Sequence, residues 1–105
     1  MLSLFLALAL AAAQPAAAAS TAPPPPPSSH LAKIMARGDG RSAETAWKVG
    51  NVHEEYEIVH ALGLEVQSQA LVVRKKPYDV LTVRDPRDGT TRALWFDIGS
   101  FFPEF

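Results

Sequence analysis

The apolar positions between Asn51 and Gly63 recur at helical spacing and predict one amphipathic helix. Asn51 is a favourable N-cap residue, and Glu54 three positions later completes a pattern similar to a capping box. Gly63 suits the left-handed conformation that ends many helices. The side chains expected on the buried face are Val52, Tyr56, Val59 and Leu62, with Ile58 at its edge.

After this helix the apolar residues gather in short runs rich in β-branched and aromatic side chains, which is typical of strands. We expect strands over 47–49, 70–73, 78–84 and 90–98. Residues 85–89 carry proline early and glycine last, which predicts a hairpin turn between the last two strands. The chain should therefore fold as an α+β domain, with one helix packed on a small three- or four-stranded, mostly antiparallel sheet.

Residues 1–19 are an apolar run that ends in small residues. The length and the alanines at its end are typical of a secretory signal peptide, although only the terminal amine supplies positive charge at its start. The run breaks at Gln14-Pro15, short of the ~20 apolar residues that a membrane-spanning helix needs. We expect an exported protein, periplasmic or secreted, with no integral membrane span after signal cleavage.

Residues 20–37 are rich in proline, alanine and serine, with five consecutive prolines from Pro23 to Pro27. Proline favours an extended backbone, so we expect a largely disordered linker here. Residues 30–37 have the pattern of two helical turns, and a helix this short is marginal in isolation. The single folded α+β domain is then expected to cover residues 38–105.

The composition excludes several classes of function. The chain has no cysteine, which excludes disulfides, thiol catalysis and a lipid anchor on cysteine. Its 10 basic and 11 acidic residues give a net charge of −1, and all the acidic residues lie within 38–105. The one basic run, 74–76, is interpreted as a solvated turn between strands. We therefore expect no nucleic-acid partner.

The side chains that could carry chemistry form no recognisable constellation. His53 and His60 are two helical turns apart, too far to bind one metal ion. Asp79 and Asp97 are expected on neighbouring strands, where a carboxylate pair could act as general acid and base. Single charged residues on the solvated face of a sheet are also ordinary. We predict no catalytic residue, no metal and no cofactor.

The chain ends in an aromatic segment that contains Phe101 and Phe102. Two interpretations stay open for these side chains. They could fold back and close the end of the core, or they could form an exposed patch that binds a partner.

Several segments resemble a family of small exported bacterial domains of unknown function. They are GDGRSAETAWKV, EEYEIVHALG, QSQALVV, PYDVLTVRDPRDGTTRALWFDI and SFF. The resemblance extends over most of residues 38–102, and it departs from the expected pattern at Gly99, where serine is expected. It implies an exported single-domain protein and brings no activity with it.

If this family shares a functional surface, the matched polar residues that no turn requires are its candidates. They are Glu55, Tyr56, Gln67, Gln69, Tyr78, Asp79 and Asp97. Gln67 and Gln69 are expected on one face of their strand by its two-residue period. The alternative is that these groups satisfy one another's hydrogen bonds at the edge of the core.

The favoured functional hypothesis is a non-enzymatic binding or accessory module of the bacterial envelope, which acts through a protein partner or as a homo-oligomer. The alternative is a small hydrolase or ligand-binding domain that uses Tyr78, Asp79 and Asp97 on the sheet. A structural or spacer protein without a discrete site is a third interpretation.

Overall fold

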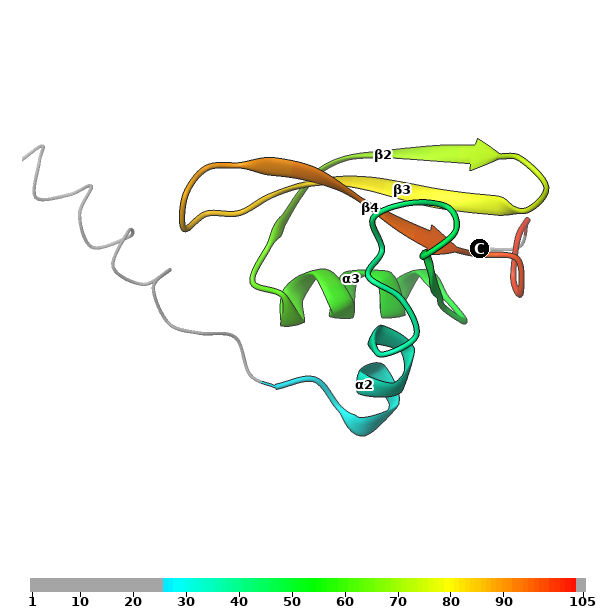
Figure 1. Ribbon diagram of the computed structural model, residues 1–105, viewed down its shortest axis with the longest axis horizontal. Helices are drawn as coiled ribbons and strands as arrows, with labels where there is room; N and C mark the ends of the chain where they lie inside the picture. Colours follow the sequence, from blue (N-terminus) through cyan, green and yellow to red (C-terminus); the bar gives the residue numbers. More distant parts are fainter. Residues whose placement is uncertain (1–25, 104–105) are drawn as a thin grey trace, which may run out of the picture.

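The computed structural model describes residues 26–103, which form two layers (Figure 1). The elements in chain order are α2 (Ser29–Met35), β1 (Trp47–Lys48), α3 (Val52–Ala61), β2 (Glu65–Val73), β3 (Pro77–Arg84) and β4 (Thr91–Asp97). The four strands form one sheet, and both helices lie below it in Figure 1. The predicted α+β class and mostly antiparallel sheet are therefore confirmed. The predicted signal peptide, residues 1–19, lies outside the described residues.

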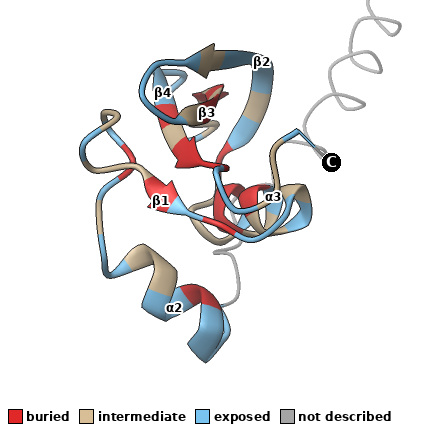
Figure 2. Cartoon of the chain, turned by 90° about the vertical axis from the view of Figure 1, so that its right-hand side faces the viewer, coloured by how far each residue is buried: buried red, intermediate tan, exposed pale blue. Residues whose placement is uncertain are grey.

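The sheet has the strand order β1-β4-β3-β2. β3 pairs antiparallel with both β2 and β4, whereas β1 pairs parallel with β4 at Trp47↔Phe96 and Lys48↔Asp97. The alternation along β3 and β4 places Leu81, Val83, Leu94 and Phe96 toward the helices. Buried segments of β1, β3, β4 and α3 gather in the interior between the two layers (Figure 2).

Helix α3 begins as its sequence predicts, but it presents a different face to the sheet. The Asn51 side chain accepts a hydrogen bond from Glu54 N at 2.9 Å, and Glu54 Oε1 accepts one from Gly50 N at 2.7 Å. The fully buried positions are Glu55, Ile58 and Val59, whereas Tyr56 is 44% exposed. The prediction of a buried Tyr56 is wrong, because the helix turns the stripe 55–58–59 toward the sheet, and Tyr56 lies outside it.

Helix α2 belongs to the packed part of the chain. Leu31 is buried in the core cluster, and Ile34 and Met35 pack against that cluster. Trp47 Nε1 donates hydrogen bonds to the Met35 carbonyl at 3.2 Å and to the Gly38 carbonyl at 2.9 Å. The packed structure therefore extends N-terminal to residue 38, into the segment predicted as a linker. None of the described helices is long and apolar enough to span a membrane.

The β3–β4 hairpin closes through the predicted turn. Asp85 N donates to the Thr90 carbonyl at 2.8 Å, and Gly89 N donates to the Asp85 carbonyl at 2.7 Å. Gly89 has a φ of +78°, which a glycine adopts without strain. Asp85 Oδ1 also accepts a hydrogen bond from Arg87 N at 2.9 Å, so the aspartate stabilises the turn's backbone as expected.

Candidate functional site

Two carboxyl groups meet in the buried interface between α3 and the sheet. Glu55 projects from the buried face of α3, and Asp79 lies on the helix-facing side of β3, opposite Phe96. Their exposed fractions are 0% and 1%. Burial of two acidic groups in one place is costly unless at least one is neutral or well hydrogen-bonded.

Gln69 covers this pair from the edge of the sheet. It lies on β2, in register with Leu81 of β3, so it shares the helix-facing side with Asp79. Gln69 Nε2 donates to both carboxylate oxygens of Asp79, at 2.9 Å and 2.7 Å. The amide thereby satisfies an acceptor site on each oxygen of Asp79.

Glu55 has no comparable partner. Neither Oε1 nor Oε2 of its carboxyl group accepts or donates a hydrogen bond of ordinary geometry. Burial raises the pKa of Glu55 to about 9, and the nearby Asp79 carboxyl adds to the increase. Glu55 is therefore a neutral carboxylic acid at pH 7, held beside the side chain of Asp79.

This arrangement differs from an open acid–base site. A general acid must reach a substrate within hydrogen-bond distance, and Glu55 has no exposed surface. No group of three or more His, Asp or Glu side chains suited to a metal ion occurs in the described part of the chain. The geometry gives Glu55 and Asp79 a role in the folded core.

The other predicted residues lie elsewhere. Tyr78 and Asp97 are paired across β3 and β4 on the opposite face of the sheet from Asp79. Tyr78 packs edge-on against Trp95 at 5.7 Å between ring centroids, and Arg74 lies 5.0 Å over the Trp95 ring. The structure therefore separates Tyr78 and Asp97 from Asp79, and the three groups share no pocket.

Gln67 and Gln69 do not have equivalent positions on β2. The register of β2 against β3 shifts between Val66 and Ser68, so a bulge lies at Gln67 and breaks the two-residue period there. The expectation that Gln67 and Gln69 share one face through that period is not met. Of the candidate residues, the structure brings together Glu55, Gln69 and Asp79.

Phe101 and Phe102 lie at the end of the sheet, just after β4. Both are partly buried and pack against the core cluster. The backbone amides of both residues donate to the Ile98 carbonyl, at 3.1 Å and 2.9 Å. This position fits the interpretation in which the phenylalanines close the core.

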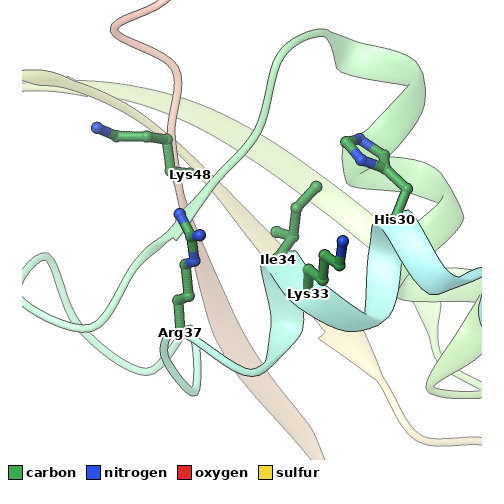
Figure 3. Close-up of a pocket in the computed structure, with 5 residues that line it drawn as sticks. All are labelled: His30, Lys33, Ile34, Arg37 and Lys48. Carbon is green, nitrogen blue, oxygen red and sulfur yellow. The ribbon is translucent and has the colours of Figure 1, made fainter.

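A second group of polar residues was missed by sequence reasoning. Two neighbouring hollows, of about 200 Å³ and 430 Å³, share Lys48 of β1 as a common wall. The smaller is lined by His30, Lys33, Ile34, Arg37 and Lys48 (Figure 3). The larger is lined by Lys48, Lys75, Lys76, Pro77, Asp97, Gly99 and Ser100. These cations are far apart in the sequence, so no local pattern could have revealed their grouping.

The fold and its polar groups define a small α+β domain with a buried pair of carboxyl groups and a cationic surface at one end. Residues 28–104 match the family model described as Domain of unknown function (DUF4919). The match covers most of the chain, and the protein belongs to this family. No curated protein and no solved structure matches the chain.

Proposed function

We propose that the protein is an exported, non-enzymatic binding module of the bacterial envelope that acts through protein contacts, first with a second copy of itself along strand β2. Export is supported by the apolar run over residues 1–19 and its small-residue end. The observation that carries the contact is the free edge of β2.

β2 is the longest strand and lies at the edge of the sheet. Among the described residues it pairs with β3 on one side only, so its other side presents backbone groups without a strand partner. Two of the exposed large apolar side chains are on this strand, Leu71 at 52% and Val73 at 62%. An exposed apolar edge is a template for pairing with another strand.

β2 has few of the features that usually prevent an edge strand from pairing with another chain, which are charged residues, proline and bulges. The segment 66–73 contains no charged residue and no proline, and the bulge near Gln67 leaves 69–73 in regular register with β3. The opposite edge strand, β1, is only two residues long. The long edge of β2 is therefore the part of the sheet best suited to receive a further strand.

The charges at the two ends of β2 favour a second copy as the occupant. Glu65 begins the strand, and Arg74 and Lys75 follow directly after its last residue. In an antiparallel pair of β2 strands, the acidic end of one copy lies beside the basic end of the other. A symmetric dimer of this kind would extend the sheet across both copies.

Light scattering coupled to size exclusion tests this contact. We expect the protein to form a dimer whose population increases with concentration, and Leu71→Lys to shift it to a monomer without lowering its melting temperature. The matched control is Tyr56→Lys, because Tyr56 is a similarly exposed apolar residue on α3. A wild-type protein that stays monomeric at several hundred micromolar, or a dimer unaffected by Leu71→Lys, contradicts the proposed contact.

Export has its own test. Residues 1–22 are fused to a reporter enzyme that is active only outside the cytoplasm, with Leu6→Arg in the apolar run as the control. We expect activity from the natural sequence and none from the control. An inactive natural fusion contradicts export and leaves the proposed β2 contact to its own experiment.

The hydrolase alternative has less support. It needs Tyr78, Asp79 and Asp97 to act together, whereas Asp79 faces α3 and the other two face the opposite side of the sheet. Asp97 does line the larger of the two hollows, so a ligand-binding role is better argued from the cations around it.

A further inference from the structure

We propose that the two hollows that share Lys48 form one binding site for a compact, multiply charged anion of the phosphate type. This inference does not depend on the β2 contact, and the two proposals share only Lys75, which follows the end of β2. The shared wall, Lys48, lies on β1, at the opposite edge from β2.

The hollows collect a large part of the chain's positive charge. Five of the 10 basic side chains line them, although the chain as a whole has a net charge of −1. These five are Lys33, Arg37, Lys48, Lys75 and Lys76, and they include all four lysines of the sequence. Such a concentration of one charge raises the local potential and attracts anions.

Most of these cations are not neutralised by the protein. Within the described residues, Lys33, Arg37, Lys48 and Lys75 have no carboxylate within ion-pair distance. Lys76 alone is paired, with Nζ 3.4 Å from Oδ2 of the buried Asp97. The His30 side chain at the rim contacts Glu54 at 2.8 Å. The free ammonium and guanidinium groups are therefore available to a ligand.

The fold brings the cations together from three separate places. Lys33 and Arg37 come from α2 and the residue stretch after it, Lys48 from β1, and Lys75 and Lys76 from the turn between β2 and β3. Figure 3 shows the Arg37 side chain extending toward Lys48, whose own side chain runs away from Ile34, and both residues line the smaller hollow. The packing of α2 against β1, which Trp47 supports, is what keeps the two halves of the site adjacent.

The side chains favour phosphate over a single carboxylate. Lysine binds phosphate as a point charge, and arginine presents a fork of donors to two oxygens. Two adjoining hollows around one central lysine suit a ligand with at least two anionic groups, because Lys48 can contact both. The ligand is either a soluble polyphosphate-like molecule or the phosphate headgroup of a lipid, which share this chemistry.

The probe for the soluble source is inorganic tripolyphosphate, and its binding to the full chain is measured by titration calorimetry at low salt. We expect saturable binding with one site per chain, weakened at least tenfold by Lys48→Gln and progressively by added salt. The matched control is Arg92→Gln, which removes one exposed positive charge at the opposite end of β4 and should change affinity less than twofold. Thermal melting of both variants verifies that they are folded.

The second arm uses vesicles that carry a phosphomonoester lipid, compared with vesicles of a zwitterionic lipid. Binding to tripolyphosphate alone identifies a soluble ligand, and binding to the anionic vesicles alone identifies a headgroup; either result supports the site if Lys48→Gln abolishes it and Arg92→Gln does not. Absence of saturable binding to both probes, or equal losses in the two variants, overturns the proposal.

Amine labelling provides an independent readout, since every lysine of the chain lines the site. A bound anion should slow the reaction of Lys33, Lys48, Lys75 and Lys76 together, as measured by mass spectrometry. Unchanged labelling at saturating probe contradicts binding in the hollows, even if binding occurs elsewhere on the protein.

Discussion

Glu55 is the residue whose environment departs most from the usual behaviour of its type. Its carboxyl group has no exposed surface and lies beside the Asp79 side chain, so burial holds it neutral, with its pKa raised to about 9. The titratable group that affects it is Asp79 of β3, whose own oxygens accept from Gln69. Above pH 4.5, the usual pKa of glutamate, Glu55 is therefore ionised in the unfolded chain and must take up a proton on folding.

The sign of this effect can be tested by pH. Because the pKa of Glu55 is higher in the folded than in the unfolded chain, the free energy of unfolding is greatest below the pKa of an unfolded glutamate. It decreases as pH rises toward about 9. We expect Glu55→Gln to raise the free energy of unfolding, more at pH 8 than at pH 5, with a difference on the order of 2 kcal/mol. Urea denaturation at both pH values measures it.

The control for this prediction is Glu57→Gln on the same helix, where the side chain is about 42% exposed. It should show no comparable dependence on pH. A Glu55→Gln variant that is equally destabilised at pH 5 and pH 8 would contradict the protonated state assigned to Glu55.

The candidate residues were predictable in part. Glu55, Gln69 and Asp79 are among the polar residues that no turn requires, and they lie together in the structure. The burial of Glu55 was not predictable, because a glutamate in the first turns of a helix normally suits the helix dipole at the surface. Only the angle at which α3 rests on the sheet decides that Glu55 points inward and Tyr56 outward.

At the scale of elements, the boundaries follow local signals closely where caps and turns exist. Asn51 begins α3 and the 85–89 turn closes the β3–β4 hairpin, both as the sequence indicates. The sequence indicates a strand whose β-rich run is 70–73 and which also carries Gln67 and Gln69, and β2 extends from Glu65 to Val73. Its first half has polar residues on both faces, and pairing with β3, which no local pattern shows, makes it a strand.

The cap of α3 provides a test at this scale. Asn51→Ala removes the acceptor for Glu54 N, and we expect a loss of about 1 kcal/mol in the free energy of unfolding. Asn51→Asp keeps an oxygen at this position and should retain most of the stability. Equal losses for the two variants would show that the side-chain oxygen is not what stabilises the helix start.

The Trp47 indole attaches the end of α2 through hydrogen bonds, in addition to the apolar packing of the helix. Trp47→Phe keeps an aromatic ring in the core but removes the donor to the Met35 and Gly38 carbonyls. We expect a loss of about 1–3 kcal/mol and faster amide exchange within α2. Trp95→Phe, on the other face of the sheet, serves as the control. Unchanged exchange in α2 after Trp47→Phe would contradict this role for the indole.

At the scale of the whole molecule, α2 is part of the cooperative unit. Leu31 is 5% exposed within the core, and Ile34 and Met35 cover the same cluster. The sequence did not predict this, because a short helix after a proline run has little stability of its own. Burial against α3 and β1 stabilises α2. These contacts exist only after the sheet has formed, so the local sequence does not indicate them.

The stabilities of two fragments, which begin at residue 26 and at residue 38, show where the folded domain begins. We expect residues 26–105 to unfold in one cooperative transition, and residues 38–105 to melt at a lower temperature with exposed apolar surface. A Leu31→Ala change in the full chain should cost about 2–5 kcal/mol for the same reason. If residues 38–105 prove as stable as the longer fragment, α2 is a peripheral attachment and the unit begins at residue 38.

The two tryptophans lie on opposite faces of one sheet. Trp47 is buried against Phe96 at 5.6 Å between ring centroids, whereas Trp95 is partly exposed between Tyr78 and Arg74. Their fluorescence should therefore differ in wavelength and in quenching by iodide. Single-tryptophan variants would give the molecule two internal spectroscopic reporters, one for the melting of the core and one for events on the uncovered face of the sheet.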